Sequence, residues 1–318
     1  MAEIGTDILK AKTLLEAGEL VAIPTETVYG LAGNALNASA VTRIFEVKDR
    51  PQFDPLIVHV PDIRKAGSYV TDIPEKARLL AEHFWPGPLT LLLKKKSIIP
   101  DLVTSGLDTV GIRCPDHALT LALLTSLSFP LAAPSANPFG YVSPTRPEHV
   151  DEQLGDKIHY ILDGGNCEVG IESTIVGFEN DDAIVYRMGG LSIEAIEETI
   201  GKVKIETHST SNPKSPGQLK SHYAPAKKVF IGKIEELLQQ YPAHHAGLLT
   251  FQEDFNSPYQ FILSPGGTLE EAAQNLFIAL RAFEKMEIDV ILAELVPDIG
   301  IGRAINDRLR RAAATADR

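Results

Sequence analysis

Residues 20–35 read LVAIPTETVYGLAGNA, and this stretch decides the fold class. The apolar run at 20–23 predicts a short buried strand, which ends at Pro24 because proline cannot donate to a strand ladder. Hydroxyl side chains follow at once, at Thr25 and Thr27. Open α/β sheets collect ligand groups at such strand ends. The stretch therefore predicts an α/β domain with a binding site where this strand stops.

The segments that follow and precede this stretch alternate between helix and strand. Apolar residues at helical spacing predict helices at 7–17, 39–47, 74–84, 117–127 and 192–200. Runs of branched apolar residues predict strands at 55–60, 89–96, 109–113, 130–134, 159–162, 172–178 and 183–187. Many short strands follow one another near 159–187, which favours mixed over purely parallel pairing. We expect an α/β (α+β) domain: a twisted mixed sheet with flanking helices.

The composition changes at residues 207–225, where Ser, Thr, Pro and Lys replace large apolar residues. Such a composition is typical of a linker, so we expect one domain over 1–206 and another over 226–318. The second segment alternates again and predicts a small parallel α/β, Rossmann-like domain that ends in a helix from Arg303 to about Ala313. Its GIGRAI run at 300–305 lacks the third glycine of a dinucleotide fingerprint, so a turn and a helix start are favoured.

Composition and charge exclude several classes of protein. The net charge is −12, from 30 basic and 42 acidic residues over 318, which is unsuited to coating nucleic acid by bulk electrostatics. Two cysteines cannot form a disulfide framework, and no apolar run reaches the roughly 20 residues of a membrane helix. We therefore expect a cytoplasmic protein with no membrane contact. The P-loop, H-E-x-x-H, C-x-x-C and G-x-S-x-G motifs are all absent from the sequence.

Basic side chains mark the ends of several predicted elements. Lys48 and Arg50 follow a helix, where they can converge on one anionic group or merely satisfy the helix end. Arg113 closes an apolar strand, which is costly unless it meets an anion or a carboxylate. Arg187 closes another strand, and His59 lies inside a third, where a hydrogen-bonded core histidine is the commoner role.

Small polar residues complete the predicted site. The run AAPSANPFGYVSPT at 132–145 carries Ser135, Asn137 and Ser143, and GIEST carries Ser173. Short side chains let a ligand lie against the backbone, although a plain Pro/Ser loop would look the same. Arginines mixed with hydroxyls and amides at strand ends predict a pocket for a phosphorylated or carboxylated small molecule.

Six segments in order resemble the YrdC-type family. They are IPTETVYGLAGNA, the K-x-R of KDRPQFDPLIVHV, WPGPLTLLL, LDTVGIRCPDH, LAAPSANPFGYVSPT and GIESTIV. SPGQLKSHYAP, followed by a small α/β domain, resembles the longer, two-domain threonylcarbamoyl-AMP synthases. The resemblance covers essentially the whole chain. It implies a nucleotidyltransferase that converts L-threonine, bicarbonate or CO2, and ATP to threonylcarbamoyl-AMP and pyrophosphate, for threonylcarbamoyladenosine modification of tRNA.

The resemblance also implies a role for each candidate residue. Catalysis would need charge neutralisation and alignment, with Lys48 and Arg50 on the triphosphate. The residues implied on the nucleotide side are Arg50, Asp54, Thr109, Ser135, Ser143, Arg187 and Tyr223. Those implied on the threonine side are Thr27, His59, Arg113, the backbone at Ala133, and Ser173, with Thr25 and Asn137 as neighbours. Mg²⁺ would be held mainly by the ATP phosphates, without a metal site of the protein's own.

The linker and the partners follow from the same resemblance. Tyr223 would lie on a segment that folds over the nucleotide pocket as a lid, although composition alone favours a disordered tether. The product would pass to a separate tRNA threonylcarbamoyl transferase, and the chain itself could contact tRNA. Three alternatives remain: an RNA-binding module of the same fold, a paralogue that has lost activity, and the carbamoyl-adenylate-forming maturase of hydrogenases. The two cysteines and the short chain argue against the maturase.

Overall fold

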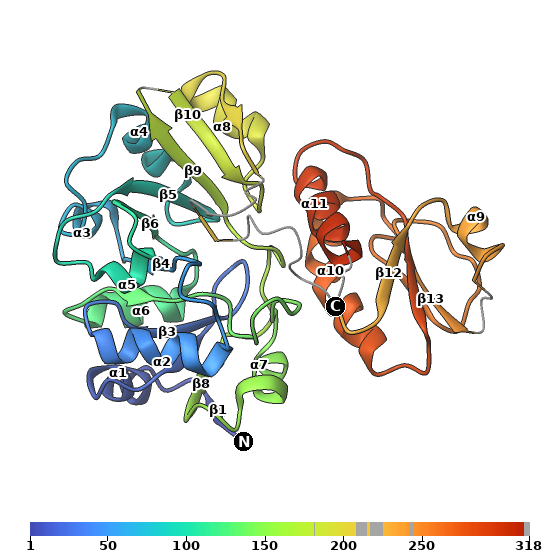
Figure 1. Cartoon of the computed structure of the whole chain (residues 1–318), viewed down its shortest axis with the longest axis horizontal. Coiled ribbons are helices and arrows are strands. Elements are labelled where there is room, and N and C mark those ends of the chain that lie inside the picture. The colour runs from blue at the N-terminus through green and yellow to red at the C-terminus, as the bar shows by residue number, and fades with distance from the viewer. Residues whose placement is uncertain (181, 208–214, 217–224, 242–244, 315–318) are drawn as a thin grey trace.

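The computed structural model describes residues 1–180, 182–207, 215–216, 225–241 and 245–314, and it shows two domains joined near residue 207 (Figure 1). The first domain holds an eleven-stranded sheet and the second a four-stranded sheet. The strands of the first domain are β1 (Glu3–Gly5), β2 (Val21–Ile23), β3 (Gly30–Asn34), β4 (Ile57–His59), β5 (Leu89–Lys94), β6 (Thr109–Arg113), β7 (Leu131–Ala132), β8 (Tyr160–Leu162), β9 (Thr174–Glu179), β10 (Asp182–Arg187) and β11 (Lys204–Ile205). Its helices are α1 (Ile8–Glu16), α2 (Ala38–Lys48), α3 (Ile63–Ala66), α4 (Glu75–Phe84), α5 (Asp101–Thr104), α6 (Ala118–Ser126), α7 (Pro147–Leu154) and α8 (Ile193–Ile200).

The large sheet is mixed, as the sequence predicts. Its strand order is β1-β8-β2-β3-β7-β4-β6-β5-β9-β10-β11. The central strands β4 and β6 are parallel, so their carboxyl ends lie at the same edge. Strand β7 runs antiparallel to β4, and β9 runs antiparallel to β10 while lying parallel to β5. Residues just after β4, β6 and β10, and just before β9, consequently meet at one place.

A side-chain cap and a left-handed residue determine where helix α2 begins and ends. The Asn37 side chain accepts hydrogen bonds from the backbone amides of Ser39 and Ala40 and thereby begins α2. The helix ends at Asp49, whose φ of 52° is left-handed. This residue turns the chain sharply, so that Lys48 and Arg50 leave the helix end in different directions.

Strand β3 and helix α7 are among the elements of the first domain that were not predicted from the sequence. The GLAGN stretch forms strand β3 although it has few branched residues; β2 and β7 flank it in the sheet. Gly33 suits this strand because a Cβ there would lie 2.9 Å from Leu20 Cδ2. Helix α7 forms from a mostly polar stretch of sequence, in which only Pro147, Val150 and Leu154 are buried. Both elements are stabilised by tertiary packing rather than by their own propensity.

The second domain is a small parallel α/β domain, as predicted. Its sheet order is β12-β15-β13-β14, with every neighbouring pair parallel. The strands are β12 (Lys228–Ile231), β13 (Ala246–Thr250), β14 (Gln260–Ile262) and β15 (Val290–Ala293). The helices are α9 (Ile234–Leu238), α10 (Leu269–Glu284) and α11 (Gly302–Ala313). The GIGRAI run is a turn that opens α11, as favoured above.

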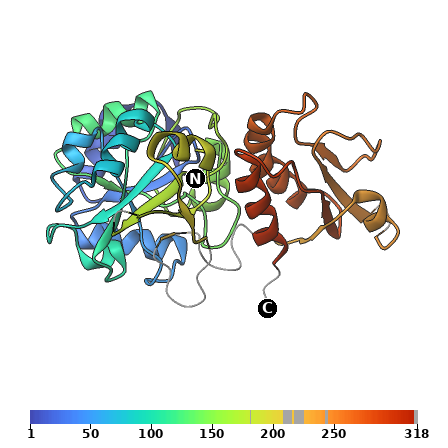
Figure 2. The same ribbon diagram turned by 90° about the horizontal axis from the view of Figure 1, so that it is seen from above.

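Helices α10 and α11 face the first domain in both views (Figures 1 and 2). The hydrophobic core of the second domain extends across the boundary, because Val28, Val142 and Ile171 of the first domain belong to the same buried cluster as α10 and α11. All three are at most 6% exposed. The two domains therefore share one continuous apolar contact, which fixes α11 against the segments that surround the site described below.

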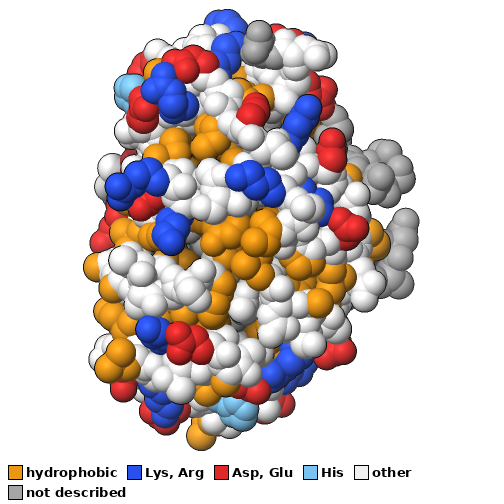
Figure 3. Space-filling view, turned by 90° about the vertical axis from the view of Figure 1, so that its left-hand side faces the viewer, with side chains coloured by type: hydrophobic (Ala, Val, Ile, Leu, Met, Phe, Trp, Pro, Cys, Tyr) orange, Lys and Arg blue, Asp and Glu red, His pale blue; other side chains and the backbone are white. Residues whose placement is uncertain are grey.

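The surface carries charge of both signs. On the face of the first domain turned away from the second, Lys and Arg alternate with Asp and Glu around patches of apolar surface (Figure 3). No broad basic field covers the described part of this face, which disfavours the RNA-binding alternative there. Within the described residues, no helix combines the length and apolar character required to cross a membrane.

Candidate active site

A cavity lies at the shared edge of the large sheet. Its empty volume is about 510 Å³, part of it open to solvent. The lining residues come from strand ends and the loops that follow them. They are Val28, Arg50, Pro55, Ile57, His59, Arg113, Ala133, Pro134, Ser135, Glu172, Arg187 and Pro216. Six of the predicted site residues lie in this wall: Arg50, His59, Arg113, Ala133, Ser135 and Arg187.

Arg50 is held rigidly at one side of the cavity. Its Nε donates to the Asp54 carbonyl at 3.0 Å, and its Nη2 donates to the Pro55 carbonyl at 2.9 Å. The same Nη2 lies 2.8 Å from Asp54 Oδ2, in an ion pair that is at least 95% buried on both sides. Burial raises the pKa of Asp54, and the charges of Arg50, Lys48 and Arg187 oppose that rise. Asp54 therefore orients Arg50 and is not among the described residues that line the cavity, and its contact with the nucleotide stays a prediction.

Lys48 lies near the ion pair of Arg50 and Asp54, but its side chain points towards the loop at 135–137. Its Nζ donates to the backbone carbonyls of Ser135, at 2.5 Å, and of Asn137. The side chain is 1% exposed, and Lys48 is not among the described residues that line the cavity. Burial and the nearby Arg50 charge lower the pKa of Lys48 well below its ordinary value. Lys48 therefore fixes the loop at 135–137, and the shared clamp of Lys48 and Arg50 on a triphosphate stays a prediction.

His59 and Arg113 also line the cavity. They are register partners at the ends of β4 and β6. Arg113 Nη2 lies 2.7 Å from Glu26 Oε2, so the arginine on the apolar strand meets a carboxylate, one of the two partners the sequence left open. His59 Nδ1 is buried with no hydrogen-bond partner among the described residues. Burial and the Arg113 charge lower the pKa of His59 to about 3, so the ring is neutral at pH 7.

Arg187 and Ser173 bring β10 and β9 into the site. Arg187 Nε donates to the Ser173 carbonyl and Nη2 donates to Ser173 Oγ, both at 3.0 Å. Ser173 Oγ also lies 2.8 Å from Thr90 Oγ1 of β5. The Ser173 hydroxyl is therefore already engaged twice, and its main effect in the described structure is to aim the Arg187 guanidinium.

The 131–145 loop supplies the remaining wall. Ala133 and Ser135 line the cavity directly. Asn137 lies behind them, where its Nδ2 donates to the carbonyls of Pro138 at 2.8 Å and Tyr141 at 2.9 Å. Ser143 donates to Glu172 Oε1 at 2.5 Å. Asn137 and Ser143 are fully buried and shape the loop from within.

The other predicted residues have distinct places. Thr25 and Thr27 are buried next to Val28, and Thr25 Oγ1 accepts from the amide of Thr27, at 3.2 Å, so it stabilises the turn after β2. Thr109 is half-buried at the amino end of β6, opposite Lys94, and is not among the described lining residues. Tyr223 lies outside the described residues. The roles of these four residues, and of Asn137, Ser143 and Ser173, as ligand contacts or neighbours stay predictions.

Glu172 and Pro216 were not singled out by sequence reasoning, and Glu26 was not identified as the partner of Arg113. Glu26 pairs with Arg113, and Glu172 lines the cavity. Both lie inside the motifs PTETVYG and GIEST, next to residues that were singled out, and the cost of a buried arginine was the signal that a carboxylate was needed. Pro216 of the predicted linker also lines the cavity, so the chain at this point lies against the first domain.

The arrangement suits anions held in a partly buried cavity. Arg50, Arg113 and Arg187 all line this cavity, and each is oriented by a carboxylate or a carbonyl. Preorganised guanidinium groups in a water-poor cavity stabilise phosphate and carboxylate charge well. Among the described residues, no three His, Cys, Asp or Glu side chains converge as metal ligands. That Mg²⁺ is held mainly by the phosphates of a bound nucleotide stays a prediction.

Comparisons with known proteins agree along the whole chain. A family model described as "Telomere recombination", the Sua5, YciO and YrdC group, matches residues 13–189, and one described as "Threonylcarbamoyl-AMP synthase, C-terminal domain" matches residues 191–314. Threonylcarbamoyl-AMP synthases from Pyrococcus abyssi and Bacillus subtilis are each 42% identical, over 95% and 96% of this chain and 92% of theirs. The crystal structure of P. abyssi Sua5 complexed with L-threonine has a TM-score of 0.92 at 40% identity, covering 98% of this chain and 97% of that chain. The chain belongs to the threonylcarbamoyl-AMP synthase family, in its two-domain form.

Proposed function

We propose that this protein makes threonylcarbamoyl-AMP from L-threonine, bicarbonate or CO2, and ATP. The observation that carries the proposal is the cavity itself, whose lining includes Arg50, Arg113 and Arg187. A relative of 40% identity binds L-threonine in its crystal structure, which supports threonine as one substrate. The reaction is an adenylyl transfer: the protein is a nucleotidyltransferase.

The chemistry brings three anionic groups together. The threonine amine takes up CO2 to form a carbamate, and a carbamate oxygen attacks the α-phosphorus of ATP, so that the bond to pyrophosphate breaks. Charge repulsion between the carbamate, the threonine carboxylate and the triphosphate opposes this encounter. Fixed guanidinium groups remove that repulsion without reorganising during the reaction, and this is the main catalytic contribution we assign to the protein.

The walls of the cavity suggest which substrate lies where. We assign the threonine carboxylate to Arg113, on the wall that also holds His59 and the backbone at Ala133. The neutral His59 ring offers its unpaired Nδ1 to the amino acid without adding charge. We assign the phosphates to Arg50 and Arg187 on the other walls, with Ser135 beside them. Mg²⁺ would enter with ATP and neutralise the phosphates further.

Lys48 has an indirect part in this proposal. Because Nζ is bonded to two carbonyls of the 135–137 loop, we assign it to positioning Ser135 next to the phosphates. Pro216, in a described part of the linker, lines the cavity, where it would help to keep water from a hydrolysable mixed anhydride. The product would then pass to a tRNA threonylcarbamoyl transferase.

Pyrophosphate release tests this function. Wild-type protein with ATP, Mg²⁺ and bicarbonate should release pyrophosphate only when L-threonine is present, and Arg50→Ala should abolish the release. Arg64→Ala is a matched control, because Arg64 is an 89% exposed arginine of α3. Loss of release in Arg50→Ala but not in Arg64→Ala supports the assignment. Threonine-independent release would contradict it, and steep salt-dependent RNA binding instead would favour the RNA-binding alternative.

A further inference from the structure

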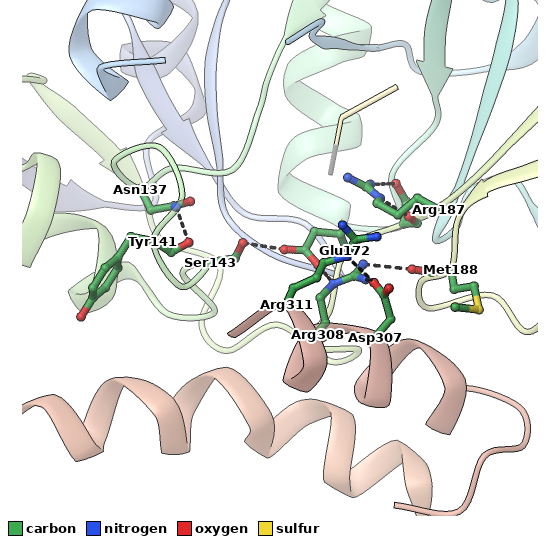
Figure 4. A network of polar contacts seen from close by, with 10 residues as sticks. Asn137, Tyr141, Ser143, Glu172, Arg187, Met188, Asp307, Arg308 and Arg311 are labelled. Atoms are coloured by element: carbon green, nitrogen blue, oxygen red, sulfur yellow. Dashed lines mark hydrogen bonds and ion pairs between the residues drawn. The ribbon is translucent and has the colours of Figure 1, made fainter. Parts of the chain in front are cut away.

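Arg308 of the second domain reaches the back of the cavity. Its side chain is 0% exposed, and Nε donates to Glu172 Oε2 at 2.8 Å. Its Nη2 donates to the Met188 carbonyl at 2.9 Å, and Nη1 pairs with Asp307 at 2.7 Å. Figure 4 shows this guanidinium between α11 and the segment that carries Glu172. One residue of the second domain thus holds a residue that lines the cavity.

Glu172 links Arg308 to the part of the cavity wall that we assign to the phosphates. While Oε2 accepts from Arg308, the other oxygen, Oε1, accepts from Ser143 Oγ at 2.5 Å. Ser143 in turn lies on the loop that carries Asn137 (Figure 4). Ser135 precedes Asn137 by two residues in the same loop. An unbroken chain of hydrogen bonds therefore runs from α11 to that loop.

A second arginine of the same domain holds the same loop. Arg281 of α10 donates to the carbonyls of Ser143, at 3.3 Å, and of Val142. Its guanidinium also lies over the Tyr141 ring, 5.3 Å from the centroid. Because Val142 is buried in the core that α10 and α11 form, the loop is tied to the second domain through both polar and apolar contacts.

The contact between Arg308 and Glu172 affects the charge of the cavity wall. A carboxylate in the wall of a cavity for triphosphate would repel the ligand and attract the arginines that should bind it. Burial alone would raise the pKa of Glu172, but the charges of Arg308 and Arg187 outweigh burial and hold it below its usual range. Glu172 therefore stays ionised, and Arg308 is the cation directly bonded to it.

We propose that Arg308 is a positioning residue for ATP. Through Glu172 it neutralises a negative charge in the cavity wall, holds Ser143 in place, and leaves the Arg187 guanidinium directed at the phosphates. The second domain is then part of the ATP site, although none of its described residues lines the cavity. This inference rests on the proposed function, because it assumes that ATP occupies this wall.

The chain offers a matched control on the same helix. Arg303 of α11 also pairs across the domain boundary, with Glu194 at 3.0 Å, but both side chains are about one-third exposed or more. Glu194 belongs to α8 and does not line the cavity among the described residues. Arg303→Met, like Arg308→Met, removes one positive charge and one interdomain ion pair. It leaves the contacts of Glu172 unchanged.

The experiment measures KM for ATP, KM for L-threonine and kcat from threonine-dependent pyrophosphate release. Arg308→Met should raise KM for ATP about tenfold while KM for L-threonine changes less than about threefold, because the disturbed wall is the nucleotide wall. Arg308→Lys should raise KM for ATP less than Arg308→Met does. Lysine keeps the positive charge but lacks the planar guanidinium that makes several directed hydrogen bonds. Arg303→Met should match wild type within about twofold.

A double-mutant cycle separates positioning from general destabilisation. Once Glu172→Gln has removed the charge, Arg308→Met should have little additional effect on KM for ATP. If Arg308→Met does not fold, Arg308→Lys decides the question, with unfolding midpoints measured beside the kinetics. Equal effects of Arg308→Met and Arg303→Met, additivity in the cycle, or a wild-type KM in a folded Arg308→Lys would each overturn the inference. Absence of threonine-dependent release by wild type would instead overturn the proposed function.

Discussion

His59 and Arg113 are register partners on neighbouring parallel strands, and both side chains line the same cavity. The Val60 amide donates to the Arg113 carbonyl at 2.9 Å and locks the two strand ends together. A neutral ring therefore lies next to a guanidinium that is already paired with Glu26. This wall can accept a carboxylate at Arg113 and hydrogen-bond a neutral or amino group at His59, which matches an amino acid.

Arg113→Lys should therefore impair threonine binding selectively. Lysine keeps the charge that balances Glu26 but loses the two-pronged geometry for a carboxylate. We expect KM for L-threonine to rise about tenfold, and KM for ATP to change little. Steady-state kinetics with each substrate varied in turn measures both. An equal rise in the two KM values would show that Arg113 does not bind L-threonine selectively.

Lys48→Met distinguishes a loop-holding lysine from a phosphate-binding one. The substitution removes the Nζ hydrogen bonds to the carbonyls of Ser135, which keeps the Asn137 amide as a donor, and of Asn137, at a cost of about 1–3 kcal/mol for a buried group left unpaired. We expect a clear loss in the free energy of unfolding by urea, together with a raised KM for ATP. Unchanged stability combined with lost activity would instead mean that Lys48 acts on the phosphates directly.

The buried neutral His59 makes stability depend on pH. Its pKa is about 3 in the folded protein but near 6.5 when unfolded, so the unfolded chain binds more protons between these values. Stability from this residue is complete above pH 6.5 and is lost as the pH falls towards 3. The expected loss between pH 7 and 5 is on the order of 2 kcal/mol. Urea unfolding at several pH values should show it.

His59→Asn provides the control for this pH dependence, because asparagine does not titrate in the range. The variant should lose stability less steeply between pH 7 and 5 than wild type does. Parallel curves for the two proteins would assign the dependence to other groups.

Gly189 allows a close approach that the site requires. A Cβ at this position would lie 2.2 Å from the Glu172 carbonyl oxygen, on the segment that carries Ser173. Gly189→Ala should therefore cost about 1–3 kcal/mol of unfolding free energy and displace the segment before β9, with a loss of activity. Gly232→Ala, where the nearest atom would be at 3.4 Å, is the matched control and should be tolerated. Tolerance of both substitutions would contradict the described packing.

Much of the fold could be predicted because its strands are apolar runs. The strand predicted at 109–113 has the same bounds as β6, and the mixed sheet and the parallel second domain are confirmed. Strand β3 could not be predicted, because GLAGN owes its place to β2 and to the space that Gly33 leaves for Leu20. Local propensity carries no information about such a fit.

The site could be predicted in outline but not in its pairings. Arg113 on an apolar strand indicated a buried partner, yet nothing local identified Glu26. Lys48 and Arg50 are close in sequence, but the left-handed Asp49 between them sends the two side chains to different partners. The contact of Glu172 with Arg308 joins two domains and leaves no local sequence signal. Long-range ion pairs of this kind are set by tertiary packing alone.

The most direct measurement is the identity of the product. The protein would be incubated with ATP, Mg²⁺, labelled bicarbonate and L-threonine, and the nucleotides would be resolved by mass spectrometry. We predict threonylcarbamoyl-AMP carrying the bicarbonate label, in amounts equal to the pyrophosphate released, and none without L-threonine. ATP consumption that yields only ADP or unmodified AMP, with or without threonine, would contradict the account.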